Sequence, residues 1–151
     1  MKIAIGCDHR GIALKQALMR FLKDSGHELI DFGTNELASI DYPDIARVLG
    51  KAVAEGQAEF GVLICSSGIG MSIAANKVRG ILAALCHDTF SARRARLHND
   101  ANVLCLGQDI LGEGLAFDIL ATFIENRFEG GRHAKRLDKV REIEAKFLDK
   151  V

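Results

Sequence analysis

The chain has 151 residues, and 20 Lys and Arg balance 20 Asp and Glu, so its formal net charge is +0 at pH 7. This balance gives no indication of binding to nucleic acid or to an anionic membrane. The hydrophobic share is 48%, but Asp, Lys, Arg or Gly interrupts every apolar run before it could span a membrane. We therefore expect a globular protein with one domain over residues 1–151.

The first residues and the cysteines favour a cytoplasmic location. Residues 1–6 form a short apolar run without the features of a cleavable signal peptide. No pair among Cys7, Cys65, Cys86 and Cys105 has C-x-x-C spacing, and no histidine stands at zinc-finger distance. We expect no metal site, and we expect buried free thiols at Cys7, Cys86 and Cys105.

Strand-like and helix-like segments alternate along the chain. Apolar runs at 2–6, 28–32, 59–65, 80–86 and 102–106 predict strands. Helical periodicity separates them, with glycine stops at Gly26 and Gly56, and residues 73–77 and 89–97 also have helical character. The predicted fold is a three-layer α/β/α sandwich with a five-stranded parallel sheet, Rossmann-like. After Gly131, residues 132–150 predict a terminal helix that packs on the body or on a partner subunit.

The segment after the third predicted strand is the most informative. Cys65 ends an apolar run, and the small residues that follow lead into a helix. Backbone N–H groups and a helix dipole then converge near the thiol, which suits an oxyanion and favours a thiolate. The pattern lacks the third glycine of a dinucleotide fingerprint and the Gly-Lys of a Walker A loop. A tight turn that only packs helix on strand is the alternative.

Asp8 and His9 directly follow the first predicted strand. Asp8 is either a helix cap or a functional carboxylate. Ligands bind parallel sheets at the carboxyl ends of strands, so Asp8, His9 and Cys65 share one crevice if the first strand lies beside the third.

Two later clusters carry polar chemistry. His98-Asn99-Asp100 either terminates a helix or contributes to a site, whereas Arg93, Arg94 and Arg96 fit a solvated or interface face. Arg132 and Arg136 stand four residues apart, so they project from one side of a helix. They are either exposed arginines near acidic groups or a pair that binds phosphate.

Ordered blocks of this chain resemble the ribose-5-phosphate isomerase B family, which is grouped with galactose-6-phosphate isomerase subunits. The blocks that carry the resemblance run from Met1 to about Phe147 and are Gly6-Cys7-Asp8-His9, Asp31-Phe32-Gly33-Thr34, Asp41-Tyr42-Pro43, Cys65 through Lys77, His98 through Leu104, and Glu129-Gly130-Gly131-Arg132-His133. The resemblance implies an aldose–ketose isomerase without metal or organic cofactor that acts on a phosphorylated sugar. It also implies homodimers or dimers of dimers whose sites are shared between two subunits.

The resemblance implies a role for each matching residue. Cys65 matches the base that moves a proton between C1 and C2, His98 the acid that opens the sugar ring, and Ser67 a helping hydroxyl. Asp8 matches a residue that contacts the substrate, and it is also counted among the catalytic residues. The remaining matches are an anion-binding loop of Ser66, Ser67, Gly68, Ile69 and Gly70, substrate contacts at His9 and Asn99, and phosphate anchors at Arg132 and Arg136.

One position departs from the family pattern. Relatives often carry arginine in the Gly-x-Arg stretch after the fifth strand, and this chain has Asp109 there. Arg10 is a candidate to compensate. The departure keeps open an isomerase of allose or galactose 6-phosphate, or a non-catalytic phosphosugar-binding protein. A redox protein would need a resolving cysteine at C-x-x-C spacing, which is absent.

Overall fold

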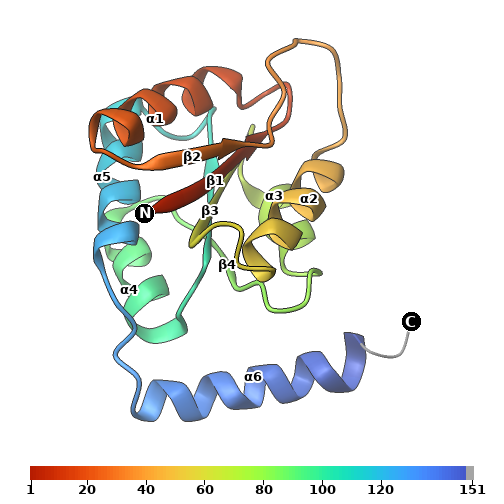
Figure 1. The fold of residues 1–151 in the computed structure, drawn as a ribbon, viewed down its shortest axis with the longest axis vertical. Helices are drawn as coiled ribbons and strands as arrows, with labels where there is room; N and C mark the ends of the chain where they lie inside the picture. The colour runs from red at the N-terminus through yellow and green to blue at the C-terminus, as the bar shows by residue number, and fades with distance from the viewer. Residues whose placement is uncertain (149–151) are drawn as a thin grey trace.

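The computed structural model describes residues 1–148 and has eleven helices and strands in that range (Figure 1). The strands are β1 (Lys2–Cys7), β2 (Glu28–Asp31), β3 (Phe60–Cys65), β4 (Ala83–Leu85) and β5 (Val103–Gly107). The helices are α1 (Ile12–Asp24), α2 (Tyr42–Ala54), α3 (Ile69–Ala75), α4 (Thr89–Asn99), α5 (Glu113–Glu125) and α6 (Arg132–Leu148). The predicted C-terminal helix is therefore present, and its last predicted residues, 149 and 150, lie outside the described part.

The five strands form one parallel sheet in the order β2-β1-β3-β5-β4. Helices α1, α4 and α5 pack on one face, and α2 and α3 pack on the other (Figure 1). The central strand β3 is buried along its whole length, as a sheet covered on both faces requires. The predicted fold class is confirmed, and so is the prediction that the first strand pairs with the third.

Two predicted boundaries are wrong, for local reasons. The fourth strand is shorter than residues 80–86, because the side-chain amide of Asn102 takes the N–H of Leu82 just before Ala83. Asn76 hydrogen-bonds both the N–H and the C=O of Ala83, and Asn102 accepts from the N–H of Leu82. The helix after Cys65 begins at Ile69 rather than Ile73, because Gly68 takes a left-handed φ of 78° and starts it at once.

Arg96 corrects the prediction of a solvated arginine face. Its guanidinium is buried, lies over the ring of Phe60 at 4.6 Å and donates to Asp100 at 2.9 Å and to the carbonyl of Ala101 at 2.7 Å. Arg93 and Arg94 of the same helix are exposed, as expected. Arg96 therefore stabilises the end of α4 from inside the protein.

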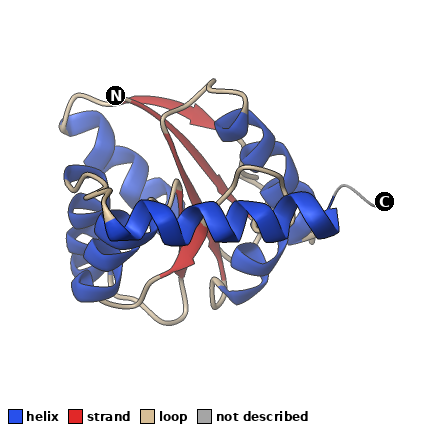
Figure 2. Ribbon diagram, turned by 90° about the horizontal axis from the view of Figure 1, so that it is seen from below, coloured by secondary structure: helices blue, strands red, loops and turns tan. Residues whose placement is uncertain are grey.

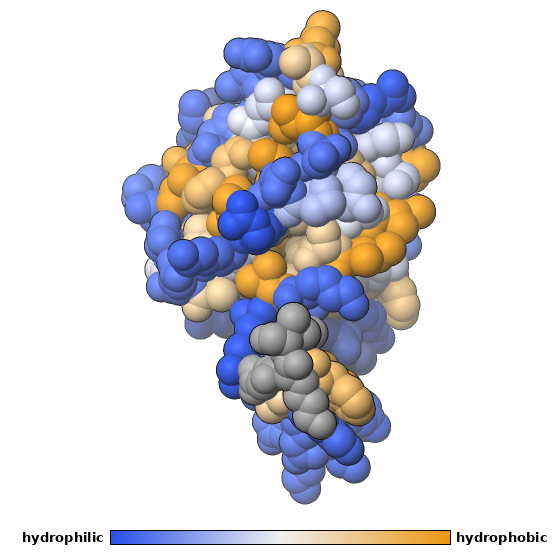
Figure 3. All heavy atoms as spheres, turned by 90° about the vertical axis from the view of Figure 1, so that its right-hand side faces the viewer, coloured by the Kyte–Doolittle hydropathy of each residue, from blue (hydrophilic) through white to orange (hydrophobic). Residues whose placement is uncertain are grey.

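Helix α6 lies apart from the sandwich and runs across one end of it (Figures 1 and 2). Leu137 is buried near its start, whereas Val140, Ile143 and Phe147 are exposed further along. Figure 3 shows this helix projecting beyond the rounded body. Within residues 1–148, no helix has both the length and the apolar character to span a membrane.

Candidate active site

The carboxyl ends of β1 and β3 bring Asp8 and Cys65 together. Cys7 is the register partner of Ile64, and the backbone N–H of Asp8 donates to the carbonyl of Ile64 at 3.3 Å. Asp8 is buried, and its carboxylate accepts the backbone N–H of Arg10 at 2.9 Å. It does not cap α1, whose N-cap is Gly11. The carboxyl ends of β1 and β3 are therefore adjacent, as predicted, and a crevice shared by Asp8 and Cys65 stays a prediction.

The loop after Cys65 turns its backbone toward the thiol. The N–H of Gly68 donates to Cys65 Sγ at 3.1 Å, and the N–H of Ile69 donates to the hydroxyl of Ser67 at 3.3 Å. A Cβ on Gly68 would lie 2.6 Å from Leu85 Cδ1, so only glycine fits this turn. The arrangement places a hydrogen-bond donor where a thiolate would carry its charge.

Ser66 is held by the residue that departs from the family pattern. Its hydroxyl donates to Asp109 Oδ2 at 2.6 Å, and Arg10 Nη2 donates to the same oxygen at 3.1 Å. The Ser66 hydrogen bond and then the Arg10 guanidinium lower the pKa of Asp109 below its ordinary value. Asp109 is thus an ionised carboxylate at the edge of the Cys65 loop.

His9 lies on the same side and is held by the loop between β2 and α2. The N–H of Ile40 donates to His9 Nδ1 at 3.3 Å, so the neutral ring carries its proton on Nε2. This loop is anchored by Lys15, a fully buried ammonium that donates to both oxygens of Asp31 and to the side-chain oxygen of Asn35. Nothing in the sequence distinguishes Lys15, because its helical position and charge resemble those of a surface lysine.

The other three thiols are buried and free, as predicted. Burial raises the pKa of Cys7 and of Cys86 to about 11, and it also raises the pKa of Cys105. These thiols remain protonated near neutral pH and act as small apolar side chains.

His98 and Asn99 form a second group of site residues around a cavity of about 210 Å³. They end helix α4, which Asp100 terminates with a left-handed φ of 47°. Arg136 of α6 lines the same cavity. The predicted helix terminus is therefore present, and His98 and Asn99 also line a cavity where a site was predicted.

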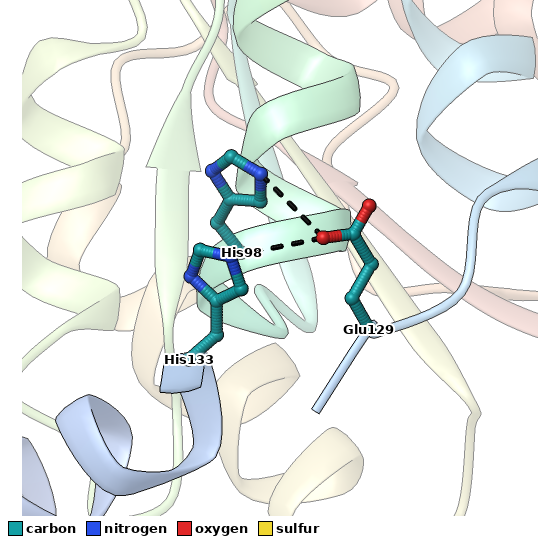
Figure 4. A group of neighbouring side chains, drawn as sticks. All are labelled: His98, Glu129 and His133. Carbon is teal, nitrogen blue, oxygen red and sulfur yellow. Dashed lines mark ion pairs between the residues drawn. The ribbon is translucent and has the colours of Figure 1, made fainter. Parts of the chain in front are cut away.

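His133 and Glu129 also belong to this group, although the sequence analysis gave them no role. The rings of His98 and His133 stack with centroids 4.0 Å apart, and Glu129 Oε2 lies 3.8 Å and 3.7 Å from their Nε2 atoms (Figure 4). Arg94 donates to His98 Nε2 at 2.9 Å, so the neutral His98 ring carries its proton on Nδ1. The signal in the sequence was the i, i+4 spacing of Glu129 and His133.

The charges around this group favour an anion over a cation. The ligand atoms of His98, Glu129 and His133 lie within 4.8 Å of one another, a spacing that a metal ion could use. However, the two rings are stacked, so their lone pairs do not converge on one point. Arg136 lines the same cavity as His98 and His133, and burial followed by the charges of His98, Arg132 and Arg136 lowers the pKa of His133 against the opposing charge of Glu129. The group is therefore suited to a phosphate oxygen.

The two groups occupy opposite ends of the sheet. Cys65 is the register partner of Gly107, where β5 ends, whereas His98 precedes Val103, where β5 begins. At roughly 3.3 Å per residue, a five-residue strand separates its ends by about 13 Å. We call the Cys65 side the thiol half-site, with Asp8, His9 and Ser66 through Gly70. The His98 side is the imidazole half-site, with Asn99, Arg132, His133 and Arg136.

Comparison with known proteins places the chain in a family. Residues 3–140 match the model of the family described as Ribose/Galactose Isomerase. Ribose-5-phosphate isomerase B of Escherichia coli is 44% identical over 95% of this chain and 96% of its own length.

Two solved structures have the same fold. Ribose-5-phosphate isomerase B of Clostridium thermocellum has a TM-score of 0.96 and 50% identity, and the match covers 97% of this chain and 99% of that one. The Mycoplasma genitalium enzyme with bound ribulose-5-phosphate has a TM-score of 0.92 and 39% identity over 96% and 97% of the two chains. The sequence and the fold together show that this chain belongs to the ribose/galactose isomerase family.

Proposed function

We propose that the chain is an aldose–ketose isomerase that interconverts ribose 5-phosphate and ribulose 5-phosphate. The observation that carries this proposal is the contact of Cys65 with the backbone of its own loop. In this contact the N–H of Gly68 points at Sγ from 3.1 Å, and the backbone of Asp8 pairs with Ile64, the residue before Cys65. Family membership and the ribulose-5-phosphate complex of a relative support the choice of substrate.

Cys65 acts as the base in this proposal. The proton on the carbon beside a carbonyl is weakly acidic, so the site must also stabilise the enediolate that forms when it leaves. Backbone N–H groups of residues 66–70 supply that stabilisation, and donors of this kind contribute about 2.7–4 kcal/mol each in other oxyanion holes. Because one proton moves between C1 and C2 and another between their oxygens, with no net oxidation or reduction of the sugar, no cofactor is required.

His98 opens the sugar ring, with Ser67 as a helping hydroxyl. An imidazole exchanges protons near neutral pH, as ring opening requires. Arg132 and Arg136 anchor the phosphate, and Asn99 contacts the sugar. The phosphate lies far from the reacting carbons, so its binding energy serves orientation.

The separation of the half-sites leads us to propose a homodimer with shared sites, either alone or as a dimer of dimers. Each site then takes its thiol half-site from one copy and its imidazole half-site from the other. The exposed apolar residues of α6 and a groove of about 1,100 Å³ beside them offer the surface for the second copy. A cytoplasmic location fits a metabolic enzyme of this kind.

Subunit mixing tests the shared site. Cys65→Ala and His98→Asn homomers are each expected to be inactive. Mixed dimers contain one site with both native residues, so reassembly of equal amounts should recover about a quarter of the wild-type activity. No recovery, with exchange verified by mass spectrometry, would show that each site lies within one chain.

Substrate comparison tests the reaction itself. We expect kcat/KM for ribose 5-phosphate to exceed that for allose 6-phosphate and galactose 6-phosphate. The second candidate is a hexose phosphate isomerase, which Asp109 favours because it replaces the usual cation. A preference for either hexose phosphate would support it. If ribulose 5-phosphate binds but exchanges no proton with solvent, the protein is a phosphosugar-binding protein instead.

A further inference from the structure

An ion pair beside the thiol half-site has no role in the reaction described above. Arg10 follows Asp8 and His9 on the β1 side, and Asp109 follows β5. Arg10 Nη2 lies 3.1 Å from Asp109 Oδ2, although the two residues are 99 positions apart in the chain. The pair thus joins two loops of the sheet edge that carries Cys65.

Hydrogen bonds hold both the backbone and the side chain of Asp109. Its backbone N–H donates to the carbonyl of Ser66 at 3.0 Å, and its carboxylate accepts the Ser66 hydroxyl at 2.6 Å. The N–H of Gln108 donates to the carbonyl of Cys65 at 2.9 Å. The carboxylate that holds Arg10 is therefore attached directly to the anion-binding loop.

Arg10 keeps most of its hydrogen-bonding capacity. A guanidinium has five N–H donors, and the contact with Asp109 uses one nitrogen. The side chain is 59% exposed, so its remaining donors are accessible to a ligand from solvent. An exposed ion pair alone adds little to stability, which makes a purely structural role a weak explanation.

We propose that Arg10 binds the phosphate group of the substrate and that Asp109 positions its guanidinium for this contact. The proposal rests on the proposed isomerase function, since it assigns a further ligand to that site. The phosphate then lies between Arg10 of one copy and the Arg132–Arg136 pair of the other. Planar donor forks match phosphate oxygens, and Arg10 restores a cation to a loop edge where Asp109 carries a negative charge.

The first experiment measures Arg10→Gln. Loss of one charge-assisted contact should raise KM for ribose 5-phosphate about 10- to 100-fold, while kcat at saturation changes little. Titration calorimetry with inorganic phosphate should show a similar loss of affinity. Lys51→Gln is the matched control, because Lys51 forms an exposed pair with Glu55 on α2. The control should leave both quantities unchanged.

The second experiment exchanges the charges to test positioning. Arg10→Asp alone should bind phosphate poorly, and adding Asp109→Arg should recover most of that affinity, because the guanidinium is again held by a carboxylate at the same edge. A merely structural pair would recover thermal stability in the double variant without recovering phosphate affinity, and that result would overturn the role of Asp109.

These measurements separate this inference from the proposed function. Unchanged KM and unchanged phosphate affinity in Arg10→Gln would overturn the role of Arg10 while leaving the isomerase intact. If the wild type does not isomerise ribose 5-phosphate, the proposed function fails. The calorimetry would still decide whether Arg10 binds phosphate.

Discussion

The rings of His98 and His133 lie parallel within 10°, with their centroids 4.0 Å apart (Figure 4). The two rings come from different helices, α4 and α6, and Glu129 faces both of them. His133 is 6% exposed, and its Nε2 has no hydrogen-bond partner among the described residues. The stack therefore couples the start of α6 to the predicted ring-opening acid.

The first prediction concerns pH and stability. Burial, followed by the neighbouring charges of His98, Arg132 and Arg136, lowers the pKa of His133, and only Glu129 opposes this. At pH values below the ordinary histidine pKa of about 6.5, His133 binds a proton in the unfolded chain more readily than in the folded chain. The free energy of unfolding should therefore fall from about pH 6.5 downward, until the lowered pKa of His133 is passed.

Urea unfolding of the wild type and of His133→Gln between pH 5 and pH 8 checks this prediction. The variant should lose part of the pH dependence. His87→Gln, at an exposed position, is the control and should keep the wild-type slope. Equal slopes in all three proteins would contradict the prediction.

The second prediction concerns Cys65. Cys65→Ala should abolish isomerisation while ribose 5-phosphate still binds, because the base is lost and the phosphate anchors remain. Coupled assays measure turnover, and calorimetry measures binding. Cys86→Ala is the control: that thiol is buried, burial raises its pKa to about 11, and it lies outside both half-sites. Turnover by the Cys65 variant would remove Cys65 as the base.

The third prediction concerns His98. His98→Asn should lower the rate of isomerisation of the cyclic substrate far more than that of an open-chain analogue. Only the cyclic form needs the ring-opening acid. Loss of one acid–base group typically costs about 10²–10⁴ in rate. The rates with the two substrates are compared in one variant, so damage to folding affects both. Equal losses would refute a ring-opening role.

The fourth prediction concerns Gly68. Gly68→Ala should destabilise the protein by about 1–3 kcal/mol and also impair turnover, because an L side chain is strained at a φ of 78° and its Cβ would lie 2.6 Å from Leu85 Cδ1. Gly112→Ala is the matched control, since a Cβ there meets nothing within 4 Å. Thermal unfolding and kcat are measured on both, and a fully active Gly68→Ala would contradict the importance of the loop backbone.

Hydrophobic period and glycine position were sufficient to predict the sheet and most of the helices. The fully apolar run that became β3 is typical of a strand covered on both faces, and Gly26 and Gly56 end their helices as expected. Predictions were less accurate where side chains replaced backbone partners. The side-chain oxygen of Asn102 accepts the N–H of Leu82 just before the fourth strand, and such a contact leaves no period in the sequence.

Charged residues were the hardest to place from sequence. Lys15 and Arg96 are charged, yet both are buried, because Asp31 and the carbonyl of Ala101 provide hydrogen-bond partners inside the protein. Local pattern cannot distinguish an arginine or lysine that faces water from one that faces such a partner.

Local periodicity and ordered motifs were enough to predict the parallel α/β/α fold, the loop after Cys65 and the family. The grouping of the site residues, in contrast, depends on the tertiary structure. It joined Asp8 to Cys65 because β1 pairs with β3, and it paired Arg10 with Asp109 across 99 positions. It also separated His98 from Cys65. The helix that connects two parallel strands must end where the next strand begins, and Cys65 lies where the strands end.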